Sequence, residues 1–507
     1  MLSRRQFLTA STSALAASVA LRSRATTADD LAATQTAVGD STVADRTLIQ
    51  STEARADLYR HYAARLGELA EWCDERRLAA QAAAVRDWLP ARQSDRAYLF
   101  IPRDFRGAND AATTLPADAL LTEFATRWAS LRRNQSAALC SLAERAAAER
   151  QASLACQLMT EAAREDFSCR RAWRFLGFSL VGDHWQTPFE IEQARSGRTW
   201  QADFGWLPKT YIARYEAGER FYRGRWMPAA EEARLRQLAH DDWRIETDHF
   251  VVTTNCSLAD GVALAGQLER LRTVWLQVFT GYLIDEDDLS KRLTAGEPLL
   301  ADAAAKHNVV QFRTRQQYND QLRSLQPQIE MTLGIYLASR RTAYFFAGAE
   351  QEAGTIDHEA THQLFHESRP VAKDVGQHDN FWIVEAVACH MQSLVGHDGY
   401  YTLGGADAGR MPVARKRRLQ DGVYLPLAQL VGLGMRDLQN HPDIARLYTQ
   451  SAGLAAFLLE RYPEATAAYL RAVYSGRADS DTLRRLTGTD YPDLDRQYGD
   501  FLAALDR

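Results

Sequence analysis

Apolar residues recur at three- and four-residue spacing over two long stretches near the N-terminus, residues 58–89 and 119–164, which predicts amphipathic helices there. Leu69-Ala70-Glu71 in the first stretch is echoed by Leu142-Ala143-Glu144 in the second. Repeated helical pairs are typical of solenoid-type arrays, which present extended binding surfaces. We therefore interpret residues 51–169 as an α-helical repeat-like region that docks a protein partner or positions the substrate.

The pattern changes after this region, since residues 170–243 hold six of the eleven tryptophans. Gly182-x-x-Trp185-x-x-x-x-Glu190 is echoed by Gly224-x-Trp226-x-x-x-x-Glu231. Glycine beside aromatic residues indicates short turns between small β elements, each packing a tryptophan. We interpret residues 170–242 as a small Trp-rich β module. An aromatic platform for glycan or peptide is the alternative, and the module is favoured because aromatic rings dominate small cores.

From Trp243 onward the pattern mixes short apolar runs with amphipathic helices. A small sheet followed by helices predicts an α+β catalytic domain over residues 243–507. Strands are expected at 249–254 and 308–312 and in a hairpin of 335–337 with 343–346; helices are expected at 259–283, near 317, at 354–367 and over almost everything after 381.

The first 50 residues look like an export signal and a linker. Arg4-Arg5 precedes a short, weakly apolar stretch over residues 7–21, which is typical of a twin-arginine signal spanning residues 1–26. The alternative is a disordered basic N-terminus. Residues 27–50 are rich in Ala, Thr, Asp and Ser, which predicts a linker. No later stretch of eighteen apolar residues occurs, so we expect an exported, periplasmic or extracytoplasmic protein without an integral membrane span once the signal is removed.

Charge and cysteine usage narrow the classes of protein. The chain has 60 basic and 65 acidic side chains, a net charge of −5, which argues against a nucleic-acid partner. The basic run Arg415-Lys-Arg-Arg418 is interpreted as a solvated helix face. The six cysteines form no Cys-x-x-Cys pair, so a thiolate zinc site is not indicated. We expect most of them to be buried small hydrophobic residues.

The segment that most clearly indicates a metal-binding motif is Thr355-Ile-Asp-His358-Glu359-Ala-Thr-His362-Gln-Leu364. Histidines four residues apart on a helix project from one face, so both imidazoles can bind one zinc ion. Glu359 lies one position further round, where its carboxylate can reach a zinc-bound water. In such sites zinc lowers the pKa of the water, and the carboxylate accepts its proton. The segment predicts a zinc-dependent hydrolase with Glu359 as the general base.

A catalytic zinc site needs a third protein ligand. His366 continues the helical row, but a residue two turns from the first histidine diverges from a point ligand. The metzincin pattern is excluded because Phe365 and Ser368 occupy the positions of its glycine and third histidine. Glu385 is the better candidate, since the preceding loop is long enough to bring a second helix alongside the first. Two imidazoles and one carboxylate suit Zn²⁺ best, although manganese or cobalt could bind in vitro.

Other polar residues near these ligands are candidates for supporting roles. Asp379 or Asp357 is expected to orient a ligand imidazole. His378 and His390 are treated as incidental, because His390 follows Glu385 by five positions and should point away from it.

The two zinc motifs together resemble those of a known group. His-Glu-x-x-His followed by Trp382-x-x-Glu385-Ala386-x-Ala388 is similar to the signature of gluzincin metallopeptidases. Residues 243–507 resemble the peptidase-MA-like domain-of-unknown-function family of exported bacterial proteins. Further matching segments are His249-Phe250, Leu425-Pro-Leu-Ala-Gln-Leu430, Tyr448-Thr-Gln-Ser451 and Phe457-Leu-Leu459. Ala386 stands where these proteins usually carry glycine.

The resemblance implies a zincin-like fold and a further catalytic residue. Tyr448 becomes a candidate donor to the transition-state oxyanion, with a tyrosine simply packed in the core as the alternative. We expect a zinc-dependent hydrolase, in first place a peptidase that cleaves a peptide or protein substrate. A non-catalytic zincin-fold scaffold protein of the cell envelope and a zinc amidase acting on cell-wall peptides are the alternatives.

Overall fold

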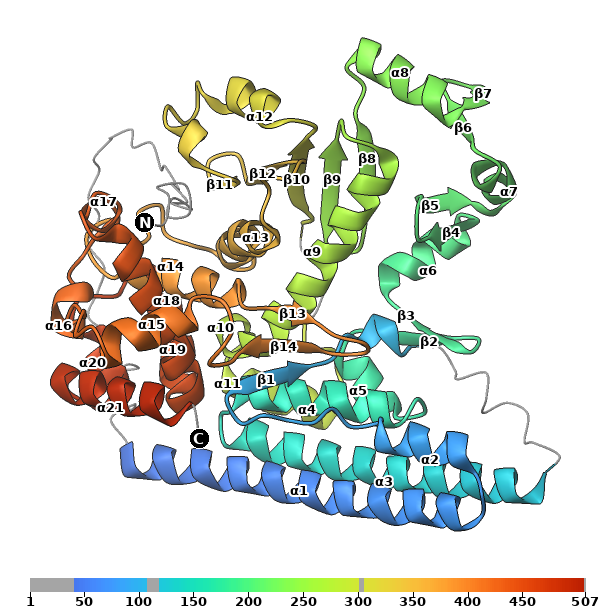
Figure 1. The fold of residues 1–507 in the computed structure, drawn as a ribbon, viewed down its shortest axis with the longest axis horizontal. Coiled ribbons are helices and arrows are strands. Elements are labelled where there is room, and N and C mark those ends of the chain that lie inside the picture. The colour runs from blue at the N-terminus through green and yellow to red at the C-terminus, as the bar shows by residue number, and fades with distance from the viewer. Residues whose placement is uncertain (1–40, 107–117, 301–304, 506–507) are drawn as a thin grey trace.

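Helices and small sheets share the molecule, so the predicted α+β class is confirmed. The computed structural model describes residues 41–106, 118–300 and 305–505. The predicted export signal, residues 1–26, lies outside these ranges. Figure 1 shows long helices at the bottom, a five-stranded sheet at the top and a group of shorter helices on the left.

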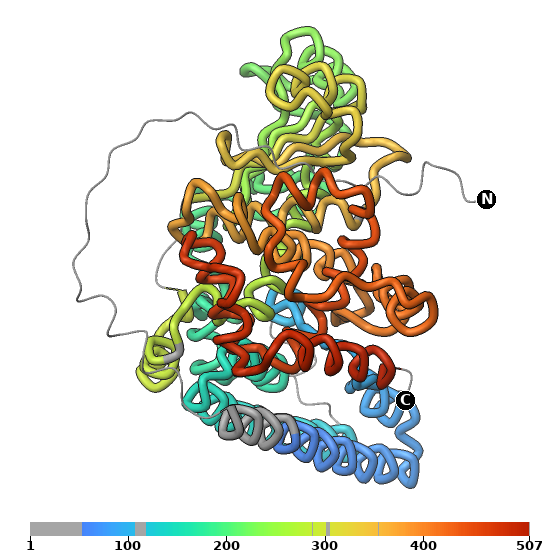
Figure 2. Tube along the Cα trace, turned by 90° about the vertical axis from the view of Figure 1, so that its left-hand side faces the viewer, coloured from blue at the N-terminus to red at the C-terminus, as the bar shows by residue number. Residues whose placement is uncertain are grey.

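The N-terminal region contains the two predicted helical pairs, α1 with α2 and α3 with α4, and α1 runs along α3 (Figures 1 and 2). The expected linker over residues 27–50 is wrong for its last ten residues, because α1 already begins at Ser41. No glycine or proline stands between Ser41 and Leu66, so nothing in the sequence ends the helix there. The bounds are α1 Ser41–Glu75, α2 Ala79–Arg86, α3 Ala119–Ala148, α4 Ala152–Glu165 and α5 Arg170–Phe175.

The Trp-rich region contains the predicted short turns and small β elements, and a helix that was not predicted follows each hairpin, which gives three hairpin–helix units (Figure 1, right). Trp185, Trp206 and Trp226 occupy the second strand of successive hairpins, 21 and 20 residues apart. Aromatic contacts join successive units, since Trp206 contacts Phe189 of the first unit and Trp226 contacts Tyr215 of the second. Trp185 packs with α3–α5. The units are β2 Ser179–Val181, β3 His184–Gln186 and α6 Pro188–Arg195; β4 Arg198–Gln201, β5 Gly205–Pro208 and α7 Ile212–Glu216; β6 Glu219–Tyr222, β7 Arg225–Pro228 and α8 Ala229–Ala239.

The five-stranded sheet has the order β11-β12-β10-β9-β8. β10 is parallel to β9 and β12, whereas the edge strands β8 and β11 are antiparallel to their neighbours. Helices α9 and α13 pack against the sheet and against each other. The predicted strands and helices all occur, with these bounds: β8 Trp243–Glu246, β9 Phe250–Thr254, α9 Leu258–Val278, α10 Thr280–Leu283, α11 Glu286–Ala295, β10 His307–Phe312, α12 Arg315–Leu322, β11 Ile335–Leu337, β12 Thr342–Phe346 and α13 Ala353–Glu367.

The C-terminal part is helical, as expected, except for two short strands. Helix α14 packs between α13 and α18, and its residues Phe381–Cys389 are buried without exception. β14 pairs with β1, which precedes it by about 300 residues, in the register Arg96↔Gly404 to Leu99↔Tyr401. The bounds are β1 Arg96–Leu99, α14 Phe381–Met391, β13 Val395–Gly396, β14 Tyr401–Gly404, α15 Met411–Leu419, α16 Leu427–Leu430, α17 Met435–Gln439, α18 Ile444–Arg461, α19 Pro463–Tyr474, α20 Thr482–Thr487 and α21 Tyr491–Ala504.

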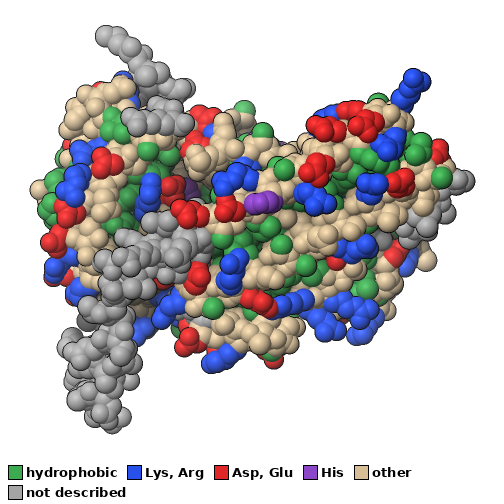
Figure 3. Space-filling view, turned by 90° about the horizontal axis from the view of Figure 1, so that it is seen from below, with side chains coloured by type: hydrophobic (Ala, Val, Ile, Leu, Met, Phe, Trp, Pro, Cys, Tyr) green, Lys and Arg blue, Asp and Glu red, His purple; other side chains and the backbone are tan. Residues whose placement is uncertain are grey.

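The face formed by the long N-terminal helices carries acidic and basic side chains in alternation (Figure 3). Among the helices that the structure describes, none combines the length and apolar character needed to cross a bilayer.

Helix α9 lies so close to the sheet that a side chain is excluded at Gly261. A Cβ atom there would lie 2.4 Å from Ile245 Cδ1 and 2.8 Å from Thr254 Cγ2, both in buried residues. We expect Gly261→Ala to lower the free energy of unfolding by about 1–3 kcal/mol, because a packed core yields little to an added methyl group. Urea unfolding of the purified variant measures this.

Gly266→Ala on the same helix is the matched control. The nearest atom to its added Cβ would be Nη1 of the flexible Arg270 side chain, at 3.2 Å. Alanine favours a helix over glycine by up to about 1 kcal/mol, so this variant should be as stable as the parent or more stable. Equal destabilisation by both substitutions would contradict the close packing at Gly261.

Candidate metal centre

Helix α13 carries the predicted histidine pair. No proline or glycine follows Gly354 within the helix, and every residue from Thr355 to Phe365 is buried. Because the two histidines are four residues apart, their side chains lie one above the other on the same face. His358 Nε2 and His362 Nε2 are 3.1 Å apart.

Asn380 fixes the start of α14, the helix that carries Glu385. It adopts a left-handed conformation with φ of 56° and is 1% exposed. Its side chain donates to the Asp479 carbonyl at 3.0 Å and accepts from the Tyr469 hydroxyl at 2.5 Å, and its N–H donates to the Val431 carbonyl at 2.8 Å. These bonds to three other segments hold the helix at one angle against α13.

The structure brings His358, His362 and Glu385 together, all buried. Glu385 Oε2 lies 3.3 Å from His358 Nε2 and 3.7 Å from His362 Nε2. Ligand atoms bound to one tetrahedral zinc ion at about 2.0–2.2 Å lie roughly 3.3–3.6 Å apart. The observed separations are close to this range, so the three side chains fit a single metal ion.

Burial and the neighbouring side chains shift the pKa values of these residues. Burial alone would raise the pKa of Glu385, but the charges of His362 and His358 lower it to about 2. Burial alone would lower the pKa of His358, but the neighbouring Cys389 and Glu385 raise it to about 10. The buried carboxylate therefore requires a positive charge among these side chains, which a proton or a metal cation can supply.

Glu359, the predicted general base, is completely buried beside the ligands and held by the sheet. The backbone N–H of Tyr336, in the edge strand β11, donates to Glu359 Oε2 at 2.9 Å. Glu359 Oε1 has no hydrogen-bond partner, nor does either oxygen of Glu385. These are the only buried carboxylate oxygens without a partner among the residues that the structure describes. One oxygen of the base is therefore positioned and the other is available.

Tyr448, on α18, is 2% exposed, and its hydroxyl also lacks a partner. Burial raises the pKa of this hydroxyl well above its usual value, and the charge of Glu385 adds to the effect. Tyr448 therefore lies within electrostatic range of the metal group and carries its proton at neutral pH. A protonated hydroxyl can donate a hydrogen bond to developing negative charge.

The expected orienting carboxylates do not reach the ligands. Asp357 Oδ1 accepts a hydrogen bond from Gln267, and Asp379 Oδ1 accepts one from Asn380. The group beside His358 is instead Cys389, one helical turn after Glu385. That four-residue spacing was the available sequence signal for Cys389, whereas the Tyr336 N–H, a backbone group, has no sequence signature.

The other histidines lie away from the ligand atoms, as predicted. His366 packs against the rings of Tyr336 and Tyr474, and burial lowers its pKa to about 4. His378 is exposed in the loop before α14. His390 lines a separate cavity of about 380 Å³ between the N-terminal helices and the C-terminal group.

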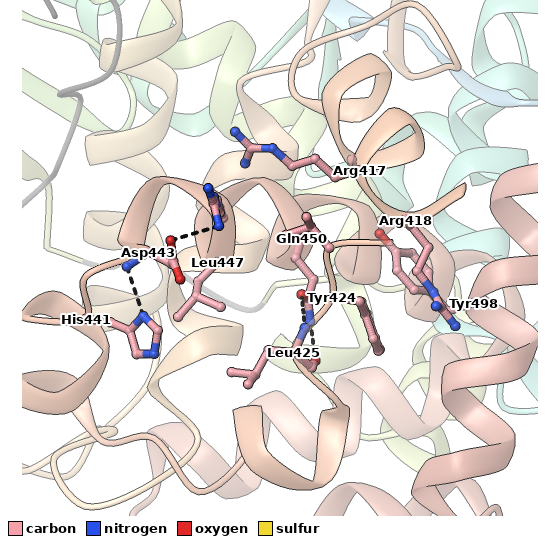
Figure 4. A pocket seen from close by; sticks show the side chains of 12 residues that line it. Arg417, Arg418, Tyr424, Leu425, His441, Asp443, Leu447, Gln450 and Tyr498 are labelled. Atoms are coloured by element: carbon pink, nitrogen blue, oxygen red, sulfur yellow. Dashed lines mark hydrogen bonds and ion pairs between the residues drawn. The ribbon is translucent and has the colours of Figure 1, made fainter. Parts of the chain in front are cut away.

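The basic run on α15 is not the solvated face that the sequence predicted. Arg415, Arg417 and Arg418 donate hydrogen bonds to the carbonyls of Leu502, Ala445 and Asp495, respectively. These arginines therefore join α15 to α18 and α21. Arg417 and Arg418 line a small cleft of about 130 Å³ together with Tyr424 and Gln450 (Figure 4).

The ligand group predicts which substitutions remove the metal. We expect the purified chain to hold about one zinc ion, and His358→Ala and Glu385→Ala to lose most of it, because each removes one of three ligands. His390→Ala is the matched control on the same helix as Glu385, and it should retain the metal. Elemental analysis after dialysis against metal-free buffer measures the content. Full zinc retention in both ligand variants would contradict this ligand set.

No family model, curated protein or solved structure matches the chain. The gluzincin resemblance therefore stays a prediction. The site itself is a buried group of two histidines and one glutamate that could hold a metal ion.

Proposed function

We propose that the chain is a zinc-dependent hydrolase of the gluzincin type with a zincin-like catalytic domain. The observation that carries this proposal is the position of Glu359. It lies next to the ligand His358 on α13, with one oxygen held by the Tyr336 N–H and the other without a protein partner. A buried carboxylate oxygen without a partner is costly for stability, and a general base for water is a role that accounts for it.

Each of these residues would have a separate role in the reaction. A bound zinc ion would polarise the scissile carbonyl and lower the pKa of the attacking water. Glu359 accepts the proton of that water at Oε1 and then delivers it to the leaving amine. Tyr448 donates a hydrogen bond from its hydroxyl to the carbonyl oxygen as negative charge develops there. His358, His362 and Glu385 hold the metal.

An extended peptide is the substrate class that the surroundings of Glu359 favour. β11 is an edge strand of the sheet, and residues 335–337 pair with β12 on one side only. The Tyr336 N–H points away from β12 and donates to Glu359, so the outer edge of β11 lies beside the base. An extended peptide that lies along this edge would present its carbonyl groups next to the base. We propose peptide-bond cleavage in the periplasm or another extracytoplasmic space, in line with the Arg4-Arg5 signal.

Glu359→Gln is the direct test of the base. The substitution keeps a group that can accept from the Tyr336 N–H but cannot take a proton from water. We expect the variant to retain zinc and to cleave fluorescently labelled casein about 10²–10⁴-fold more slowly. Rates of peptide release for parent and variant, at equal zinc content, measure the effect.

Asp357→Asn is the matched control, two residues earlier on the same helix. Its carboxyl accepts from Gln267 and does not contact the ligands, so we expect casein cleavage within about threefold of the parent rate. Unchanged cleavage by Glu359→Gln would exclude it as the base. If the parent chain binds zinc but hydrolyses neither casein nor cell-wall peptides, the scaffold alternative is favoured.

Tyr448→Phe tests the proposed oxyanion donor. We expect kcat to fall about 10²–10³-fold with KM and zinc content unchanged, because the hydroxyl acts only on the developing charge. Tyr474→Phe is the comparison, since Tyr474 is also buried and its hydroxyl also lacks a partner. A loss of kcat in Tyr474→Phe alone would assign the donor to that residue instead.

A further inference from the structure

Cys140 and Cys169 lie with their sulfur atoms 3.7 Å apart, although 29 residues separate them in the chain. Cys140 is on α3, and Cys169 immediately precedes α5. No other contact between two cysteine sulfurs occurs among the described residues; Cys73, Cys156 and Cys389 are buried separately and Cys256 is partly exposed. The two cysteines are therefore distant in the sequence and close in the fold.

We propose that Cys140 and Cys169 form a disulfide bond, making this pair a redox site that ties α3 to the start of α5. A disulfide has a sulfur–sulfur distance of about 2.05 Å. The two sulfurs must therefore approach by roughly 1.7 Å, a movement that rotation of the side chains can supply. Both residues already belong to or border the core that contains Trp173 and Trp185, so the backbone positions are fixed around them.

The environment of the pair prepares Cys169 to react first. The hydrogen bond from Cys140 lowers the pKa of the Cys169 thiol to about 6 and raises that of Cys140. Cys169 is partly exposed, whereas Cys140 is 8% exposed. Because the thiolate is the nucleophile in thiol–disulfide exchange, Cys169 is the residue that reacts first with an oxidant in solution.

The oxidant is a low-molecular-weight or protein disulfide. The Cys169 thiolate attacks one of its sulfurs, which forms a mixed disulfide and releases one thiolate. The Cys140 sulfur then loses its proton and attacks Cys169, which forms the Cys140–Cys169 bond and releases the second thiol. Two thiols are thus oxidised with the loss of two electrons and two protons, and the oxidant disulfide is reduced to two thiols.

The bond would close a loop that contains the end of α3, all of α4 and the turn before α5. Cross-linking such a loop restricts the unfolded chain and so favours the folded one. The core joined by this bond includes Trp185 of the first hairpin–helix unit. The persistence of the disulfide in the cell rests on the export proposal, since reducing compartments open such bonds. Its formation in solution does not depend on the proposed hydrolase activity.

Counting thiols in the full chain tests the proposal. After equilibration with oxidised glutathione and removal of the reagent, we expect four free thiols under denaturing conditions, and six after reduction, because the chain has six cysteines. Mass spectrometry of an unreduced digest should show a peptide containing Cys140 linked to one containing Cys169. Six free thiols without reduction, or a linkage between any other two cysteines, would overturn the proposal.

Two variants keep the test specific. Cys140→Ser should show no linked peptide, and by mass it should keep one glutathione on Cys169, because the sulfur that would release it is absent. Four thiols are then free before reduction and five after it. Cys256→Ser is the matched control, because it removes a partly exposed cysteine outside the pair. It should show three thiols before reduction and five after it. If Cys140→Ser fails to fold, the linked peptide and the thiol count of the parent chain still decide the question.

Discussion

Burial of the Glu385 carboxylate against two imidazoles is the constraint on which the second half of the chain depends. Removing a carboxylate from water costs several kcal/mol unless a positive charge lies next to it. The imidazoles on α13 can stabilise the carboxylate on α14 only if the two helices are held in contact. The sheet supports α13 from one side, and α18 supports α14 from the other. Asn380 sets the angle between the helices through bonds to three separate segments. Helices α15–α21 follow α14, and α18 thus supports the ligand group although it contributes no ligand to it.

The N-terminal region is joined to the rest of the fold by strand pairing and by buried ion pairs. β1 pairs with β14, the second strand after α14. Arg103 donates to Glu190 in the first hairpin–helix unit at 2.8 Å and pairs with Asp248, next to β9, at 2.6 Å. Both carboxylates are buried, and Arg106 also pairs with Glu190, so a network of buried charges joins three parts of the chain. A partner that docks on the N-terminal helices would therefore act on a rigid extension of the sheet.

The parts of the fold that could be predicted from sequence are those encoded by local pattern. The spacing of His358 and His362 and the apolar helix around Glu385 are properties of short segments, and both were found. The pairing of β1 with β14 was missed because it joins four-residue strands about 300 positions apart, and no local signal links them. Only two of the three glycine–tryptophan segments were recognised as similar, since the glycine stands three, one and two residues before the tryptophan in successive units. The anchoring of Glu359 was inaccessible for another reason, because its partner is a backbone N–H.

The distribution of unpaired polar atoms bears on whether the metal group is catalytic. Buried polar atoms without partners also occur elsewhere among the described residues, but those outside this centre belong to hydroxyl, amide, indole and guanidinium groups. Within the described part of the chain, the buried carboxylate oxygens that lack a hydrogen-bond partner belong to Glu359 and Glu385 alone. A metal ion would satisfy Glu385, yet it leaves Glu359 Oε1 and the Tyr448 hydroxyl without partners. A purely structural metal site would be more stable with apolar side chains at both positions. A carboxylate oxygen and a hydroxyl without partners near one group of three metal-ligating side chains are what the proposed hydrolase needs, and for this reason we prefer it to the scaffold.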